Sequence, residues 1–137
     1  MKIVEQNANA NYGDLDNDAV DHAYIIKGIL GKGGFGVVYS GVRVHDGLMV
    51  AIKEVPVCKV LEWTTLGDKN VPLELRLLFA CQSVPGVVRL IDWCLRGDYF
   101  LYIMEYSPHC RDLFDYISHK GALGKDSLKS ICQKQFW

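Results

Sequence analysis

A glycine-rich run between strand-like segments constrains this chain more than any other feature. The run reads Leu30-Gly31-Lys32-Gly33-Gly34-Phe35-Gly36. Glycines permit a tight turn and let backbone N–H groups approach phosphate oxygens without a Cβ in between. The dinucleotide-binding fingerprint has the same G-x-G-x-x-G spacing but opens a helix, whereas residues 37–44 here are β-branched and aromatic. The run therefore predicts a β-hairpin that faces phosphate groups.

A lysine ends the next strand-like segment. After a turn signal at residues 45–47, the apolar segment 48–55 contains Val50-Ala51-Ile52-Lys53. Three short strands joined by tight turns predict an antiparallel meander rather than a βαβ unit. Lys53 would add a compact positive charge beside the phosphates. The alternative for these residues is a glycine-rich hairpin that carries a surface lysine.

Residues 71–81 predict a helix, because they combine strong helix formers, an early proline and apolar residues at helical intervals. Glu74 lies in this helix and is our candidate for the acidic partner of Lys53. Glu62 is the other candidate, but its surroundings are irregular and rich in turn signals. Of the two glutamates, Glu74 is therefore the stronger candidate.

The same helix is expected to place Leu77 and Leu78 in the core. The alternative for Glu74 is a solvent-exposed side chain that pairs with a basic neighbour, Arg76 or Lys69.

Two more strand-like segments, 87–94 and 99–106, follow the helix and are separated by a turn at residues 96–98. The sequence thus predicts an α+β fold with a five-stranded antiparallel sheet and one main helix. Residues 1–22 carry five acidic side chains against one lysine and little apolar material. We expect them to form a disordered acidic arm.

In combination, these motifs resemble protein kinases, and local features are similar to the Pim family of serine/threonine protein kinases. The features are Gly33-Gly34-Phe35-Gly36, residues 38–44, Val71-Pro72-Leu73-Glu74, residues 88–93, and Asp112-Leu113-Phe114-Asp115-Tyr116-Ile117 leading to Gly121-Ala122-Leu123. The resemblance implies a protein kinase-like fold that is truncated at the start of the helical large lobe. Residues 23–104 would form the small lobe, and residues 105–137 the hinge and the first helices of an incomplete large lobe.

The resemblance also implies an ATP site. Its members would be Leu30, Gly31, Lys32, Gly33, Gly34, Phe35, Gly36, Val38, Ala51, Lys53, Glu74, Met104, Glu105, Ser107 and Asp112. Lys53 and Glu74 would position ATP as an ion pair, and Met104 would be the gatekeeper residue. Asp112 would lie near the ribose, and Asp115 is a weaker candidate for a ribose or substrate contact.

The activity that the resemblance implies is transfer of the ATP γ-phosphoryl group to serine and threonine hydroxyls of protein substrates. Mg²⁺ is expected only in a complete kinase. The hinge departs from the Pim pattern, which has a proline where this chain has Ser107, followed by Pro108. Because proline has no backbone N–H, Ser107 could restore a donor to adenine.

The motifs that carry phosphoryl transfer, H-R-D-L-x-x-x-N and D-F-G, do not occur in the sequence. The nearest match, residues 109–113, has Cys110 between the histidine and the arginine. We assign no catalytic residue and expect the chain to be inactive alone. The alternatives are a catalytically dead short form that acts as a binding or competitor module, and an unrelated β-rich binding domain that mimics the glycine motif.

Apolar side chains after the hinge would lack partners, and this exposed lower face is expected to support binding of a partner or self-association. They are Leu113, Phe114, Tyr116, Ile117, Ile131, Phe136 and Trp137.

Composition excludes several other classes. Fifteen basic and sixteen acidic residues nearly cancel, so we expect neither nucleic acid nor a membrane surface as a partner. The five cysteines form no C-x-x-C pair, which argues against a zinc site and a secreted disulfide framework. We expect a cytoplasmic location, with the nucleus as an alternative, and no metal site.

Overall fold

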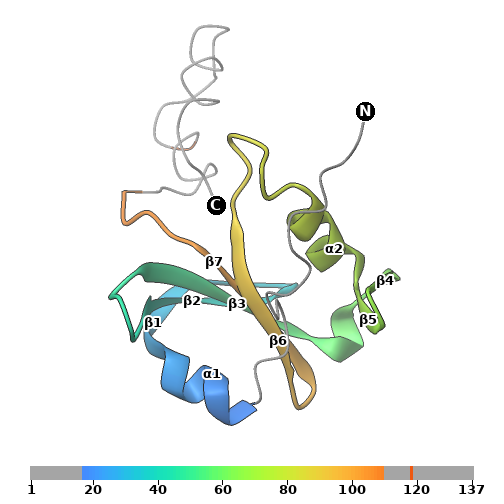
Figure 1. Cartoon of the computed structure of the whole chain (residues 1–137), viewed down its shortest axis with the longest axis horizontal. Coiled ribbons are helices and arrows are strands. Elements are labelled where there is room, and N and C mark those ends of the chain that lie inside the picture. Colours follow the sequence, from blue (N-terminus) through green and yellow to red (C-terminus); the bar gives the residue numbers. More distant parts are fainter. Residues whose placement is uncertain (1–16, 110–117, 119–137) are drawn as a thin grey trace, which may run out of the picture.

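The computed structural model describes residues 17–109 and residue 118 (Figure 1). The elements, in chain order, are α1 (Asn17–Ala23), β1 (Tyr24–Gly33), β2 (Gly36–Arg43), β3 (Met49–Pro56), a 3-10 helix η1 (Val57–Lys59), β4 (Trp63–Leu66), β5 (Lys69–Pro72), α2 (Leu73–Ala80), β6 (Leu90–Arg96) and β7 (Tyr99–Glu105). The expected hinge continuation beyond residue 109 and the apolar lower face lie outside the described residues.

Five strands form one antiparallel sheet in the order β1-β2-β3-β7-β6. The α+β prediction with a five-stranded sheet is confirmed, and so is the meander of β1, β2 and β3. The chain then leaves the sheet through β4, β5 and α2 before β7 pairs with β3. The central strands β3 and β7 are therefore hydrogen-bonded on both sides.

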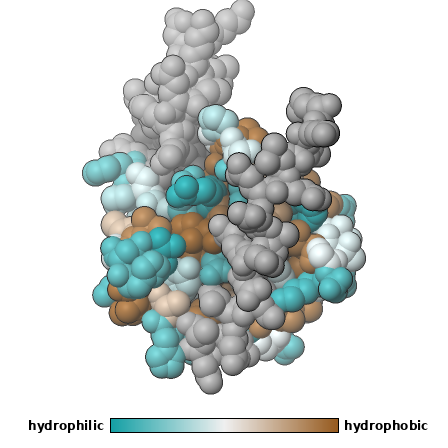
Figure 2. Space-filling model, viewed as in Figure 1, coloured by the Kyte–Doolittle hydropathy of each residue, from teal (hydrophilic) through white to brown (hydrophobic). Residues whose placement is uncertain are grey.

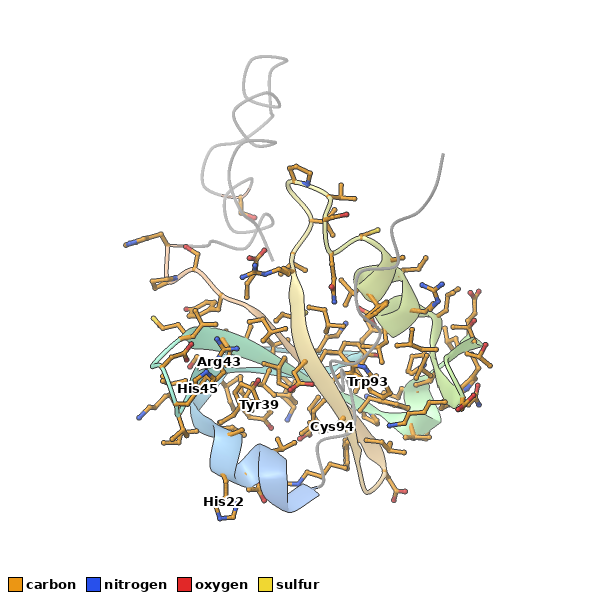
Figure 3. All side chains as sticks on the ribbon, viewed as in Figure 1. His22, Tyr39, Arg43, His45, Trp93 and Cys94 are labelled. Atoms are coloured by element: carbon orange, nitrogen blue, oxygen red, sulfur yellow. The ribbon has the colours of Figure 1, made fainter. Side chains whose placement is uncertain are left out.

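Alternation along β7 divides the core between the two faces of the sheet. Phe100, Tyr102 and Met104 belong to the cluster that packs beneath α2, and Leu101 and Ile103 belong to the cluster on the opposite face. The neighbouring β6 residues Trp93 and Cys94 are divided in the same way (Figure 3). Helix α2 is anchored by Leu75, which is 0% exposed.

Helix α1 covers part of the face opposite to α2. Its Val20 is 5% exposed and packs in the second cluster, while Ala23 accepts a hydrogen bond from the backbone of Val44. The expectation of a disordered arm through residue 22 is therefore wrong for its last six residues. The acidic composition of the whole arm concealed the apolar positions at its end, which the sheet stabilises by burial.

A second sheet, the hairpin of β4 and β5, was not expected from the sequence. Gly67 turns it with φ of 60°, and Trp63 lies edge-on to Phe100 with ring centroids 5.9 Å apart. The hairpin leads directly into α2. Part of the stretch around Glu62 is thus regular, although Glu62 itself precedes the strand.

The prediction that Leu77 and Leu78 are core residues is half wrong. Leu78 packs against the core beneath α2, but Leu77 is 54% exposed. Helix α2 has only eight residues and buries one narrow face, so Leu77 falls beyond that face.

Candidate functional site

The glycine hairpin is formed by the end of β1 and the start of β2, with Gly33 paired to Gly36. Gly36 has φ of 135°, and a Cβ at this position would lie 1.9 Å from the carbonyl oxygen of Glu54. Only glycine allows β2 to approach β3 so closely. By contrast, a Cβ at Gly31, Gly33 or Gly34 would meet nothing within 4 Å. The hairpin is therefore packed tightly against β3 at Gly36, whereas Gly31, Gly33 and Gly34, which we call the glycine rim, border open space.

Lys53 and Glu74 form the ion pair that the sequence predicted. The Lys53 Nζ lies 2.6 Å from the Glu74 Oε1, and the side chains are 20% and 51% exposed. Lys53 comes from the middle of β3, and Glu74 from the first turn of α2, where the helix dipole favours a negative charge. The structure thus gives Glu74, and not Glu62, as the acidic partner of Lys53.

The strand register gathers apolar candidate residues beside this pair. Lys53 lies opposite Val38 on β2 and Tyr102 on β7, and Ala51 lies opposite Met104. Because directly opposed residues and alternate residues share a face, all five side chains project from one face of the sheet. Ala51 and Met104 are buried there, and Val38 is partly buried. Val38, Ala51, Tyr102 and Met104 thus form a largely apolar surface, which we call the floor, and Lys53 places a positive charge beside it.

The rest of the predicted set lies around this floor. Leu30 and Lys32 are exposed on β1, and Phe35 at the hairpin tip is 71% exposed. Ser107 follows the end of β7 and is partly buried. Asp112 lies outside the described residues, as does the weaker candidate at position 115.

The described residues of the site fit a nucleoside triphosphate. The open rim at the glycines leaves room for phosphate oxygens, the Lys53 ammonium supplies positive charge, and the floor can accept a flat base. The protein kinase domain family matches residues 24–136 of the sequence. The chain belongs to the protein kinase family. This membership excludes an unrelated β-rich domain.

Individual kinases agree with the family match. The chain is 42% identical to the serine/threonine-protein kinase prk-2 of Caenorhabditis elegans over 108 residues, which cover 79% of this chain and 24% of that protein. It is 42% identical to the serine/threonine-protein kinase pim-2 of Danio rerio over 121 residues, covering 81% of this chain and 39% of that protein. The receptor tyrosine-protein kinase erbB-4 of Mus musculus is 37% identical to the chain over 108 residues, which cover 76% of this chain and 8% of that protein. The chain thus spans well under half the length of these relatives.

At the hinge side of this kinase chain, Glu105 is already engaged within the protein. Its backbone N–H donates to the Arg89 carbonyl at 2.9 Å, and its carboxylate accepts from the Arg89 N–H at 2.9 Å. Glu105 thus ties the end of β7 to the residue before β6. Its N–H is not available to a base.

Tyr102 is a residue of the site that sequence reasoning missed. Its ring lies 5.9 Å from the Lys53 Nζ, and burial and then the charge of Glu74 raise the pKa of its hydroxyl. The hydroxyl is therefore a neutral donor at physiological pH. The available signal was strand alternation, because Tyr102 stands two positions before Met104 and shares its face.

Other charged groups of the kinase chain serve the scaffold. Arg43 pairs with Asp46 at 2.7 Å in the turn after β2, where His45 also lies (Figure 3). Residues 17–109 and 118 contain no group of three or more His, Cys, Asp or Glu side chains that could hold a metal ion. Among these residues, no helix has the length and apolar character needed to cross a membrane.

Proposed function

We propose that the chain is the ATP-binding part of a serine/threonine protein kinase of the Pim group. The observation that carries this proposal is the 2.6 Å pair of Lys53 and Glu74 beside the open glycine hairpin. Lys53 would neutralise charge on the α and β phosphates, and Glu74 would hold the Lys53 side chain extended toward them. ATP supplies the γ-phosphoryl group that a complete kinase transfers to a hydroxyl.

The choice of serine and threonine as acceptors rests on the relatives. Two proteins at 42% identity are named serine/threonine-protein kinases, while a receptor tyrosine-protein kinase is 37% identical. The local Pim features support the same assignment. The protein substrates of the complete protein belong to the proposal as well, because the chain spans 24% and 39% of those two relatives.

Binding is tested by titrating ATP against the purified chain and following thermal stability or heat of binding. Lys53→Ala should weaken ATP binding by about tenfold or more, since charge-assisted hydrogen bonds contribute about 1.5–3 kcal/mol. Lys27→Ala removes an exposed lysine of β1 and serves as the matched control. Equal ATP affinity in the wild type and in Lys53→Ala would contradict the proposal.

Transfer is tested separately. Because the sequence contains neither H-R-D-L-x-x-x-N nor D-F-G, we propose that the 137-residue chain binds ATP weakly and transfers no phosphate alone. In that case its role within a cell would be that of a binding or competitor module, unless a longer protein supplies these motifs. Phosphorylation of a general protein substrate by the rigorously purified chain, lost in Lys53→Ala, would overturn the proposed inactivity.

A further inference from the structure

The strand β1 forms one edge of the five-stranded sheet and is ten residues long (Figure 1). It pairs with β2 on one side, and no strand among the described residues pairs with its other side. The backbone N–H and C=O groups on that outer side are therefore open to a further strand. A partner that uses them is an extended peptide segment, because an extended backbone is what continues the hydrogen-bond ladder of a sheet.

Three aliphatic side chains of β1 are exposed to solvent. Ile25, Ile26 and Ile29 are 48%, 52% and 66% exposed. Figure 2 shows hydrophobic surface broken by hydrophilic surface on the face in view, so a single exposed apolar residue is ordinary in this protein. Three of them within residues 25–29 of one edge strand form a local apolar surface. Together with Lys27, we call this the β1 edge surface.

The strand register places two of these side chains on the same face of the sheet. Ile26 stands two positions after Tyr24, which belongs to the core cluster on the α1 side. Ile29 lies opposite Tyr39, which packs against that cluster. Ile26 and Ile29 therefore extend the apolar face that α1 covers in part. A partner strand beside β1 would cover them with apolar side chains at alternate positions.

The charge of β1 is positive. The strand contains Lys27 and Lys32 and no acidic residue, and both lysines are exposed. No acidic group among residues 17–109 forms an ion pair with Lys27. Two copies of β1 placed side by side would bring like charges together, which is unfavourable. An acidic strand would bring opposite charges together, so the charge of β1 favours a different segment over a second copy of this chain.

The other edge strand, β6, lacks this combination. Of its apolar side chains, Leu95 is the exposed one, and the neighbouring Arg96 lies 2.9 Å from the carboxylate of Asp21 on α1. The strand also carries an acidic residue, Asp92. The two edges of the sheet therefore differ, and β1 is the edge with clustered exposed aliphatic side chains and positive charge.

We propose that the β1 edge surface binds an acidic and aliphatic segment of a partner protein as a further strand of the sheet. Backbone hydrogen bonds to the outer side of β1 hold the segment, its aliphatic side chains cover Ile26 and Ile29, and its acidic side chains pair with Lys27. The register shifts between Ile26 and Gly28 and between Ile29 and Gly31 limit unbroken pairing to short stretches. The residues of this surface lie outside the set predicted to bind ATP, so the proposal does not depend on nucleotide binding.

Backbone pairing is tested with a short capped peptide in which valine and glutamate alternate. We expect the 137-residue chain to bind this peptide, as measured by calorimetry. The same peptide with every backbone nitrogen methylated keeps the side chains but has no N–H donors, and it should not bind. A peptide of the same composition with its valines and glutamates in two blocks should bind about threefold more weakly or worse. Equal binding of the three peptides, or no binding of the alternating peptide, would overturn the proposal.

The location is tested with matched variants. Ile29→Glu removes an apolar contact and adds a repelling charge, so it should weaken binding of the alternating peptide by about tenfold. Leu95→Glu makes the same change on β6, where Leu95 is 50% exposed, and should leave binding unchanged. Equal losses in these two variants would place the peptide elsewhere and contradict the proposal.

The role of charge is tested by reversal. Lys27→Glu should weaken binding of the glutamate peptide by about two- to fivefold, because exposed ion pairs contribute modestly. The same variant should bind a matched peptide that has lysine in place of glutamate more tightly than the wild type does. An unchanged preference between the two peptides in Lys27→Glu would contradict an acidic partner.

Amide hydrogen exchange gives a measurement on the wild-type chain. The alternating peptide should slow exchange in residues 24–33 severalfold, because it covers the outer N–H groups of β1, and should leave the amides of β6 unchanged. Protection of β6 instead of β1, or of neither strand, would overturn the proposal. Protection of β1 that appears without peptide at higher protein concentration, together with the mass of a dimer, would identify a second copy as the partner and would likewise overturn it.

Discussion

The carboxylate of Asp21 on α1 lies 2.9 Å from the guanidinium of Arg96 on β6, 75 residues further along the chain. Together with the burial of Val20, this contact fixes α1 against the sheet face opposite to α2. The two contacts differ in kind, because the ion pair is exposed and the valine is buried. They should therefore differ in their effect on stability.

Asp21→Asn should lower the free energy of unfolding by less than about 1 kcal/mol, because exposed ion pairs are screened by solvent. Val20→Ala should lower it more, by about 1–2 kcal/mol, because it removes buried apolar surface. Urea unfolding followed by tryptophan fluorescence measures both. A larger effect from Asp21→Asn than from Val20→Ala would show that α1 is held by charge instead of burial.

Gly36 should tolerate no side chain. Gly36→Ala would bring its Cβ to the Glu54 carbonyl at a positive φ and should lower the free energy of unfolding by more than about 1 kcal/mol. Gly34→Ala is the matched control, since a Cβ at Gly34 meets nothing within 4 Å. Thermal unfolding of the two variants checks the difference. Similar melting temperatures would argue against the close approach of β2 and β3.

Substitutions of Leu75 and Leu77 on α2 should differ in their effect on stability, because only Leu75 is buried. Leu75→Ala should lower the free energy of unfolding by about 2–5 kcal/mol, because the side chain is 0% exposed. Leu77→Ala should have a small effect, within about 0.5 kcal/mol, which is the usual range for surface substitutions. Denaturant unfolding of both variants provides the comparison. A large loss in Leu77→Ala would mean that its face of α2 is covered in solution.

The thiol of Cys94 should make stability depend on alkaline pH. Burial raises the pKa of Cys94 from 9.0 to about 11. Between pH 9.0 and about 11, the unfolded chain loses the thiol proton while the folded chain keeps it. The contribution of Cys94 to the free energy of unfolding is therefore fully present below pH 9.0 and is lost as the pH rises toward about 11. The free energy of unfolding should fall less steeply with pH in Cys94→Ala, which removes this thiol but keeps the other groups that titrate at alkaline pH. Unfolding curves across that range decide it, and identical slopes would contradict the prediction.

The hinge can be tested with two substitutions at one position. Ser107→Pro removes the backbone N–H, whereas Ser107→Ala keeps it and removes only the hydroxyl. If Ser107 donates to adenine through its backbone, the proline variant should bind ATP about three- to tenfold more weakly and the alanine variant should match the wild type. Calorimetry with ATP makes the comparison. Identical affinities in all three proteins would remove this role for Ser107.

The sequence was sufficient for the features that local patterns determine. Alternation and turn residues predicted the five strands, and helix signals selected Glu74 over Glu62, whereas the pairing with Lys53 was implied by the resemblance to protein kinases. The exposure of Leu77 and the burial of Tyr102 were not predictable, because both depend on how α2 sits over β7. Likewise, α1 and the hairpin of β4 and β5 are stabilised by contacts with distant parts of the chain, which override weak local propensity.

The pairing of β3 and β7 on both sides has a consequence for motion. Lys53, Ala51 and Met104 lie on strands that are paired on both sides, whereas the glycine hairpin includes β1, an edge strand. We expect the amides of β3 and β7 to exchange with solvent only when much of the sheet opens. The two halves of the candidate site therefore differ in local opening free energy. We therefore expect the floor to stay in place while the glycine rim opens and closes, so that a nucleotide bound as proposed above enters and leaves without displacing the Lys53 charge.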